Sequence, residues 1–115
     1  MKKFLVLYQT PVSVIEEWMK TDPAIRKDAE EKMRGDWQKW MQAHGSAVVD
    51  MAGAGKTKRV KPEGTADIRN DVMLYSVVQA EDHATAAKMF ESHPHLGIPQ
   101  ATIDVMEINP MSGMS

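Results

Sequence analysis

The chain has 115 residues, of which 43% are hydrophobic and 26% charged, with a formal net charge of −2 and no cysteine. This length and composition indicate one folded domain and exclude a disordered chain. The lack of cysteine excludes disulfides and thiolate chemistry, and the slightly negative charge gives no field that would favour nucleic acid or an anionic membrane.

The first residues place two lysines before the apolar run FLVLY. A signal peptide needs an apolar region of about 7–15 residues, and a membrane span needs roughly 18, so neither is expected. We therefore expect a cytoplasmic protein that makes no contact with a membrane. Lys2 to Gln9 is predicted to form a strand, and because both its faces are apolar it should lie in the centre of a sheet.

A helix is predicted next. Ser13 and Glu16 have the spacing of a capping box. The pattern restarts at Asp22 and Pro23, a cap residue followed by proline at the first helical position. Apolar residues then recur every three or four positions until Gly45, the predicted C-cap. This stripe consists of Ile25, Ala29, Met33, Trp37, Trp40, Met41 and His44.

The middle of the chain is predicted to contain two strands separated by a long loop. The first strand covers residues 47–52. Residues 53–70 are polar and contain four glycines or prolines, so they are predicted to be a long polar loop of the kind that is usually functional or mobile. Val72 to Ala80 is apolar on both faces, which predicts a second central strand.

The last third of the chain is predicted to hold a short helix and an edge strand. Asp82 should cap a helix that runs through Glu91, with small residues on its inner face. Residues 102–108 alternate between apolar and polar, which predicts a strand near the edge of the sheet. Residues 109–115 are predicted to be a frayed tail.

The expected order is β-α-β-β-α-β over a single domain, residues 1–115. This order predicts an α+β fold of the ferredoxin-like type: a four-stranded antiparallel sheet with both helices on one face. The central strands are apolar on both sides, so the open face must also be buried, and a second copy of the same sheet is the simplest cover. We therefore predict a homodimer built face to face.

Two segments resemble the YCII-related proteins of the dimeric α/β-barrel superfamily: WQKWMQAHGSAVVDMAG at residues 37–53, and HATAAKMFESHPHL followed by a loop and TIDVMEI. The resemblance covers nearly the whole chain. It implies a dimeric barrel with a pocket near the inner sheet face and the loop after the second strand. Some members carry a histidine in the last turns of helix one that is proposed to work with an aspartate. The matching positions here are near Asp36 and Trp37, so His44, at the helix end, is one possible substitute.

The segment GAGKT, residues 53–57, resembles part of a phosphate-binding P-loop. That motif requires a glycine five residues before its Gly-Lys-Thr, where this chain has Asp50, and a helix afterwards to direct backbone N–H groups at phosphate. A carboxylate at that position would repel phosphate, and Pro62 and Gly64 oppose a helix. A nucleotide site is therefore disfavoured.

Asp50 has two interpretations. As an edge-strand acid it would hinder aggregation. If it faces a cleft near Lys56, Arg59 or His44, it can act as a general base or orient a ligand. The predicted site consists of Asp50 and His44 as catalytic residues and of Trp37, Lys56 and Arg59 as ligand-binding residues.

The remaining titratable residues give weaker signals. His83, His93 and His95 do not have the spacing of a transition-metal site and are predicted to be structural or surface residues, so we expect no metal and no cofactor. The basic run at residues 56–61 has no interleaved aromatic residue, which argues against nucleic acid as a partner. It can attract a small anionic ligand, and Trp37 can border a pocket for an aromatic one.

These observations leave two functional hypotheses. The first is a cofactor-independent small-molecule enzyme that uses acid–base chemistry, favoured by the polar residues gathered at 50–60. The second is a non-catalytic homodimer that binds a small ligand or a partner in the same cleft, favoured by the missing histidine of helix one.

Overall fold

The computed structural model describes residues 1–111. It contains a four-stranded antiparallel sheet and a separate two-stranded hairpin. The strands are β1 (Lys2–Gln9), β2 (Val48–Gly53), β3 (Thr57–Lys61), β4 (Gly64–Ile68), β5 (Val72–Ala80) and β6 (Thr102–Glu107). The helices are α1 (Val12–Met19), α2 (Pro23–His44) and α3 (His83–Lys88), with 3-10 turns η1 (Gly45–Ala47) and η2 (Pro94–Gly97).

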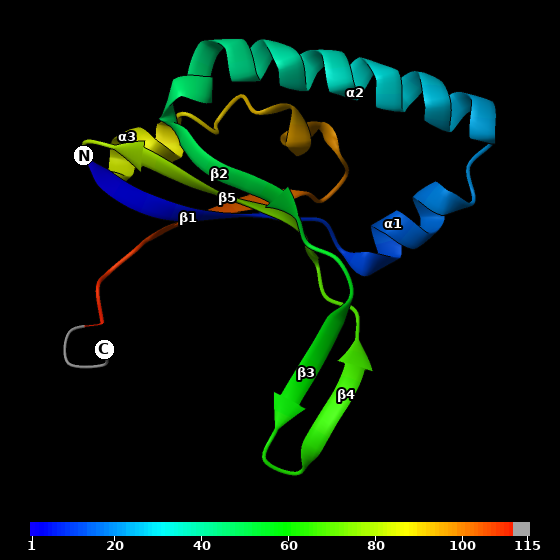
Figure 1. Cartoon of the computed structure of the whole chain (residues 1–115). Coiled ribbons are helices and arrows are strands. Elements are labelled where there is room, and N and C mark those ends of the chain that lie inside the picture. The colour runs from blue at the N-terminus through cyan, green and yellow to red at the C-terminus, as the bar shows by residue number, and fades with distance from the viewer. Residues whose placement is uncertain (112–115) are drawn as a thin grey trace.

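The predicted fold class is confirmed. The main sheet has the order β2-β5-β1-β6, so β1 and β5 are the central strands and β6 lies at an edge, as their apolar patterns predicted. Without the hairpin, the elements follow the ferredoxin-like order, with α2 and α3 on the same side of the sheet (Figure 1).

The core lies between the sheet and these helices. Every second residue of β1, namely Phe4, Val6 and Tyr8, is fully buried, because side chains alternate between the two faces of a strand. Val78 of β5 lies opposite Phe4 and is also buried. The helical side contributes Trp40, Ala86 and Phe90.

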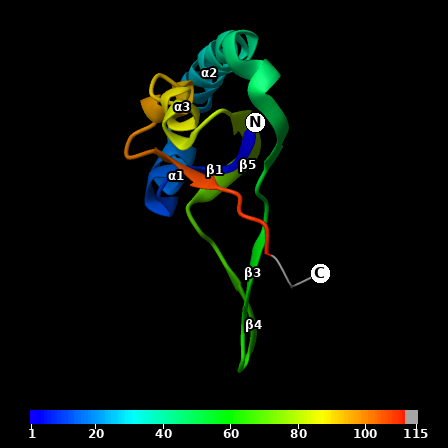
Figure 2. The same ribbon diagram turned by 90° about the vertical axis from the view of Figure 1, so that its left-hand side faces the viewer.

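The other sheet face carries no helix among the described residues, as both views of the molecule show (Figure 2). Leu5 and Leu7 of β1 lie opposite Val77 and Tyr75 of β5, and all four are only half-buried. Met106 of β6, next to Leu5, is 38% exposed. This open face is therefore the apolar surface that the two-sided pattern of the central strands predicted.

The starts of α2 and α3 follow the sequence, and the start of α1 does not. Asp82 accepts a hydrogen bond from the Thr85 amide at 2.7 Å, which confirms the predicted cap of α3. The side chain of Asp22 accepts a hydrogen bond from the Ala24 amide at 2.8 Å, which confirms the predicted cap of α2. The predicted capping box at Ser13 is wrong, because α1 begins after Pro11 without a side-chain cap. Asp71, distant in sequence, accepts a hydrogen bond from the Val12 amide at 3.2 Å and takes over part of that role.

The predicted helices also differ in extent from those observed. Only the C-terminal half of the α2 stripe packs on the sheet: Trp40 is buried, whereas Ile25 is 59% exposed and Ala29 is exposed as well. α3 ends at Lys88, earlier than the predicted Glu91, and a turn follows it.

The predicted long loop at residues 53–70 is wrong, because most of it forms the β3–β4 hairpin. Lys61 pairs with Gly64 across the turn. Gly64 has φ +144°, a backbone conformation that residues other than glycine rarely adopt. The main sheet closes before the hairpin begins, because the Ala54 amide donates to the Met73 carbonyl at 2.9 Å. Of the predicted tail, residues 109–111 are in no helix or strand, and residues 112–115 lie outside the described part of the chain.

Candidate functional site

Asp50 reaches the open sheet face because β2 contains a bulge. Val48 pairs with Val78 on the helix-covered face, and regular alternation would place Asp50 on that same face, opposite Ser76. The register instead shifts between Val48 and Asp50, and Asp50 lies opposite Val77. An extra residue in one strand of a ladder redirects the side chains that follow it. The bulge thus removes a carboxylate from the core.

On the open face Asp50 forms a pair with Tyr75. The Tyr75 hydroxyl donates to Asp50 Oδ2 at 3.2 Å, and the Met51 amide donates to Oδ1 at 2.9 Å. The negative charge of Asp50 raises the pKa of Tyr75, so the phenol stays protonated and remains a donor. The carboxylate is exposed, on an edge strand, and borders the apolar residues of the open face.

The structure does not bring Asp50 together with His44 or Trp37. His44 ends α2, on the helical side of the sheet, and its ring lies 5.0 Å from that of Trp40. Trp37 packs between α2 and the sheet, with its ring 5.6 Å from Tyr8. Both therefore belong to the layer opposite the face that carries Asp50.

The most unusual polar group in this layer is a pair of buried histidines, which the sequence indicated only as structural or surface residues. His93 and His95 are each 2% exposed. The ring of His93 lies 4.3 Å from that of Trp37 and 4.6 Å from that of Trp40, nearly perpendicular to the former. Its Nδ1 accepts a hydrogen bond from the His95 amide at 3.0 Å, so the neutral ring carries its proton on Nε2, an atom without a hydrogen-bond partner within residues 1–111.

Burial in this apolar setting lowers the pKa of His93 to about 4, with smaller contributions from His95 and His44. Burial also lowers the pKa of His95, although the Gln9 carbonyl, 3.0 Å from its Nε2, opposes the shift. Both imidazoles are therefore neutral at pH 7 and serve as packing groups. In the part of the chain that the structure describes, no three potential ligands converge on a metal position.

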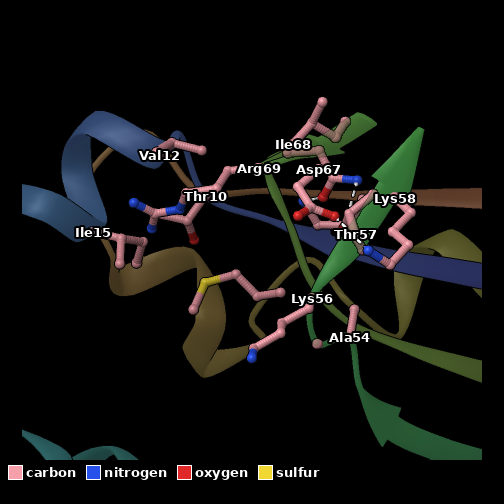
Figure 3. Close-up of a pocket in the computed structure, with 14 residues that line it drawn as sticks. Thr10, Val12, Ile15, Ala54, Lys56, Thr57, Lys58, Asp67, Ile68 and Arg69 are labelled. Carbon is pink, nitrogen blue, oxygen red and sulfur yellow. Dashed lines mark hydrogen bonds and ion pairs between the residues drawn. The ribbon is translucent and has the colours of Figure 1, made fainter. Parts of the chain in front are cut away.

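A groove opens where the hairpin leaves the sheet. Its volume is about 1130 Å³, enough for a small organic molecule. One wall is apolar and consists of Val12, Ile15, Val72 and Met73. The other comes from the two links of the hairpin, residues 54–58 and 67–70 (Figure 3). Thr10 also borders the groove, and its buried hydroxyl has no hydrogen-bond partner within residues 1–111.

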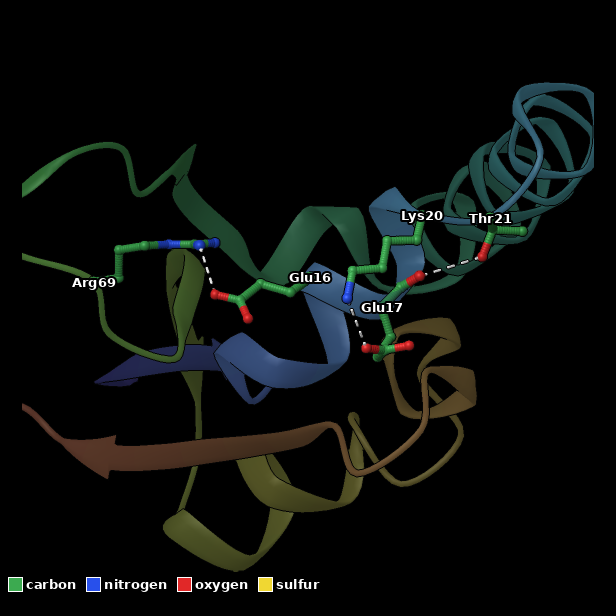
Figure 4. A network of polar contacts seen from close by, with 5 residues as sticks. All are labelled: Glu16, Glu17, Lys20, Thr21 and Arg69. Carbon is green, nitrogen blue, oxygen red and sulfur yellow. Dashed lines mark hydrogen bonds and ion pairs between the residues drawn. The ribbon is translucent and has the colours of Figure 1, made fainter.

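Cations outnumber carboxylates among the groove residues, which include Lys56, Lys58 and Arg69 against Asp67. Lys58 is neutralised by Asp67 at 2.6 Å. Arg69 pairs with Glu16 of α1 at 3.2 Å, in an exposed region that also contains the Glu17–Lys20 pair (Figure 4). Lys56 forms no ion pair within residues 1–111, so its charge is available to a ligand.

Arg59, the last of the residues predicted for the site, does not border this groove. It lies on β3, is exposed, and pairs with Ala66 across the hairpin. The structure therefore distributes the predicted residues over four places: Asp50 on the open face, His44 and Trp37 in the helical layer, Lys56 in the groove, and Arg59 beyond the groove on the hairpin.

Comparison with known proteins gives similarity to solved structures alone. No family model matches the chain, and no curated protein matches it. Among solved structures, the chain is similar to 5-chloro-2-hydroxyhydroquinone dehydrochlorinase (TftG) from Burkholderia phenoliruptrix AC1100, in complex with 2,5-dihydroxybenzoquinone. The TM-score is 0.47 and the identity 9%, over 90% of this chain and 91% of that one. The function of this chain must accordingly be argued from its own residues.

A second finding concerns the helices alone. None of those within residues 1–111 combines the length and the apolar character needed to cross a membrane.

Proposed function

We propose that this chain is a homodimer related to the YCII-related proteins and that it binds a small organic anion in the groove beside the hairpin. The open sheet face supports the dimer: Leu5, Leu7 and Val77 form a continuous apolar surface, and such surfaces on small domains commonly mark an interface. A second copy would bury this surface symmetrically.

The position of Lys56 is the observation that supports an anionic ligand. Its ammonium group is at the edge of a groove whose far wall is apolar, and no carboxylate within residues 1–111 neutralises it. A molecule that fits both features has a carboxylate or another anionic group on a compact apolar body. The nearby Arg69 adds positive charge, because its ion pair with Glu16 is exposed and therefore weak.

Replacement of Lys56 tests this proposal. We expect small aromatic and aliphatic carboxylates to raise the unfolding temperature of the unmodified protein, and Lys56→Gln to weaken the best of them about tenfold or more, because hydrogen bonds to charged groups contribute roughly 1.5–3 kcal/mol. Thermal shift identifies the ligand, and titration calorimetry measures its affinity.

Lys39→Gln is the matched control, since Lys39 is an exposed lysine of α2 outside the groove. The control should bind the ligand as the unmodified protein does. Equal weakening by both substitutions would mean that the groove is not the binding site, and a panel without any stabilising anion would refute the proposed ligand class.

A second candidate, an enzyme that uses Asp50 as a general base, is favoured by the Asp50–Tyr75 pair. The Tyr75 donor positions the carboxylate on the face that the proposed dimer would cover, where exclusion of water strengthens a base. Each ligand found by thermal shift is then incubated with the protein and analysed for products. For a ligand that is converted, Asp50→Asn should lower the turnover rate at least a hundredfold and change the affinity of the protein for that ligand little. Turnover that survives this substitution would remove Asp50 as the base.

A further inference from the structure

The β3–β4 hairpin lies outside the packed body of the protein. Among its strand residues only Thr57 and Ile68, at the end nearest the sheet, are partly buried. Val60 is 77% exposed. An isolated two-stranded hairpin is marginally stable in water, so a hairpin of this kind needs a surface to pack against. No other element of residues 1–111 provides one.

The hairpin projects in a definite direction. Both views show it extending away from the layer of α2 and α3, on the side of the open sheet face (Figures 1 and 2). Its five-residue strands span about 17 Å, whereas two sheets packed face to face are about 10 Å apart. A second sheet placed on the open face would therefore lie alongside the hairpin, within its reach.

The charges of the two surfaces are complementary. Arg59 and Lys61 lie on one face of β3, because side chains two residues apart point the same way, and neither forms an ion pair within residues 1–111. The open face carries carboxylates at Asp50 and Asp104, opposite Val77 and Leu7. Asp104 accepts a hydrogen bond from Gln9, a neutral partner that leaves its charge uncompensated.

We propose that the hairpin is a clasp that packs against the second copy of the chain, with Arg59 and Lys61 directed at the carboxylates around the partner's open face. This inference rests on the proposed homodimer and adds to it the surface that holds the two copies together. Two-fold symmetry gives the dimer two clasps, one from each chain. Their cations would make association stronger at low ionic strength, because exposed charges are screened by salt.

Removal of the hairpin gives the direct test. Residues 57–68 are replaced by Asn-Gly, which forms a tight turn between Lys56 and Arg69. The sheet is expected to remain intact, since it closes at the Ala54–Met73 hydrogen bond and no core residue comes from the hairpin. We expect the dissociation constant of the dimer, measured by analytical ultracentrifugation, to rise at least tenfold while the near-ultraviolet circular dichroism of the tryptophans is retained.

A charge-reversal variant keeps the hairpin and tests the same contact without shortening the chain. Arg59→Glu combined with Lys61→Glu should also raise the dissociation constant at least tenfold, and more at low salt. The matched control reverses two exposed lysines of α2, Lys27→Glu and Lys39→Glu, and should leave the dissociation constant unchanged.

The outcomes separate this inference from the dimer itself. If the unmodified chain is a monomer, the proposed homodimer fails, and the clasp fails with it. If the unmodified, shortened and charge-reversed chains all dimerise equally tightly, the homodimer stands and only the clasp is refuted. Weakening by both hairpin variants and not by the control supports it.

Discussion

Acidification from pH 7.5 to pH 4.5 should lower the free energy of unfolding by about 2–3 kcal/mol through His93 alone. The folded protein holds the pKa of His93 at about 4, against 6.5 for the exposed side chain. Between these two pH values His93 is protonated in the unfolded chain and neutral in the folded protein. Stability is complete above pH 6.5 and is lost as the pH falls from 6.5 towards 4. Urea unfolding at several pH values measures this loss.

Two features oppose protonation of this ring. Its Nδ1 accepts the His95 amide proton, so the doubly protonated imidazolium cannot keep that hydrogen bond. The surrounding rings of Trp37, Trp40 and Phe90 also exclude water, and the charged form loses its hydration.

His93→Asn isolates the effect, because asparagine can still accept the His95 amide but does not titrate. The variant should be less stable at pH 7.5, since ring packing is lost, yet less sensitive to acid by about 2 kcal/mol. Some sensitivity remains through His95, whose pKa is also lowered. If His93→Asn is equally acid-sensitive, the ring is not the source.

Replacement of Trp40 by alanine should lower the free energy of unfolding by about 3–5 kcal/mol. Trp40 is the one fully buried residue of α2. Its ring stacks on Phe90 at 5.2 Å, and its Nε1 donates to the Met89 carbonyl at 3.0 Å, so it attaches the long helix to the segment after α3. Its removal leaves a large cavity and an unpaired carbonyl.

Two further variants separate the contributions to this loss of stability. Trp40→Phe keeps an aromatic ring and loses the indole donor, and we expect an intermediate cost that includes about 1 kcal/mol for the hydrogen bond. Ile25→Ala removes an exposed apolar residue of the same helix and should change stability by less than about 0.5 kcal/mol. Chemical denaturation of the three variants gives the comparison. Equal losses at positions 40 and 25 would contradict the burial of Trp40 and the exposure of Ile25.

The central strands and the start of α2 were predictable because their signals are local. Two-sided apolar runs mark β1 and β5, and the sequence Asp22-Pro23 marks a helix start. The hairpin was not predictable, because its strands are rich in charged residues and have no buried face, whereas sequence patterns detect strands through a buried face. The cap of α1 was missed for another reason: Asp71 acts from 59 residues away, where a local motif cannot indicate it.

The candidate site was predictable only in part. Lys56 borders a groove, as its position directly after Gly55 had suggested. The bulge before Asp50 has no sequence signature here, so strand alternation alone would have buried the carboxylate. The buried histidines carried a faint signal that went unused: His93 precedes Pro94 at the start of a 3-10 turn and caps that turn with its own ring nitrogen.

The main sheet ends at the Ala54–Met73 hydrogen bond, before the hairpin begins. Residues of the sheet and core are therefore constrained by the fold, whereas residues of the hairpin are not. The register of the four-stranded sheet and the buried core are both set outside residues 57–68, so we expect substitutions, insertions or deletions in that segment to leave the rest of the fold unchanged. Lengthening a surface connection costs little free energy. Duplicated copies of such a chain can therefore diverge in this segment alone, and each can acquire its own recognition surface while the domain beneath it is inherited intact.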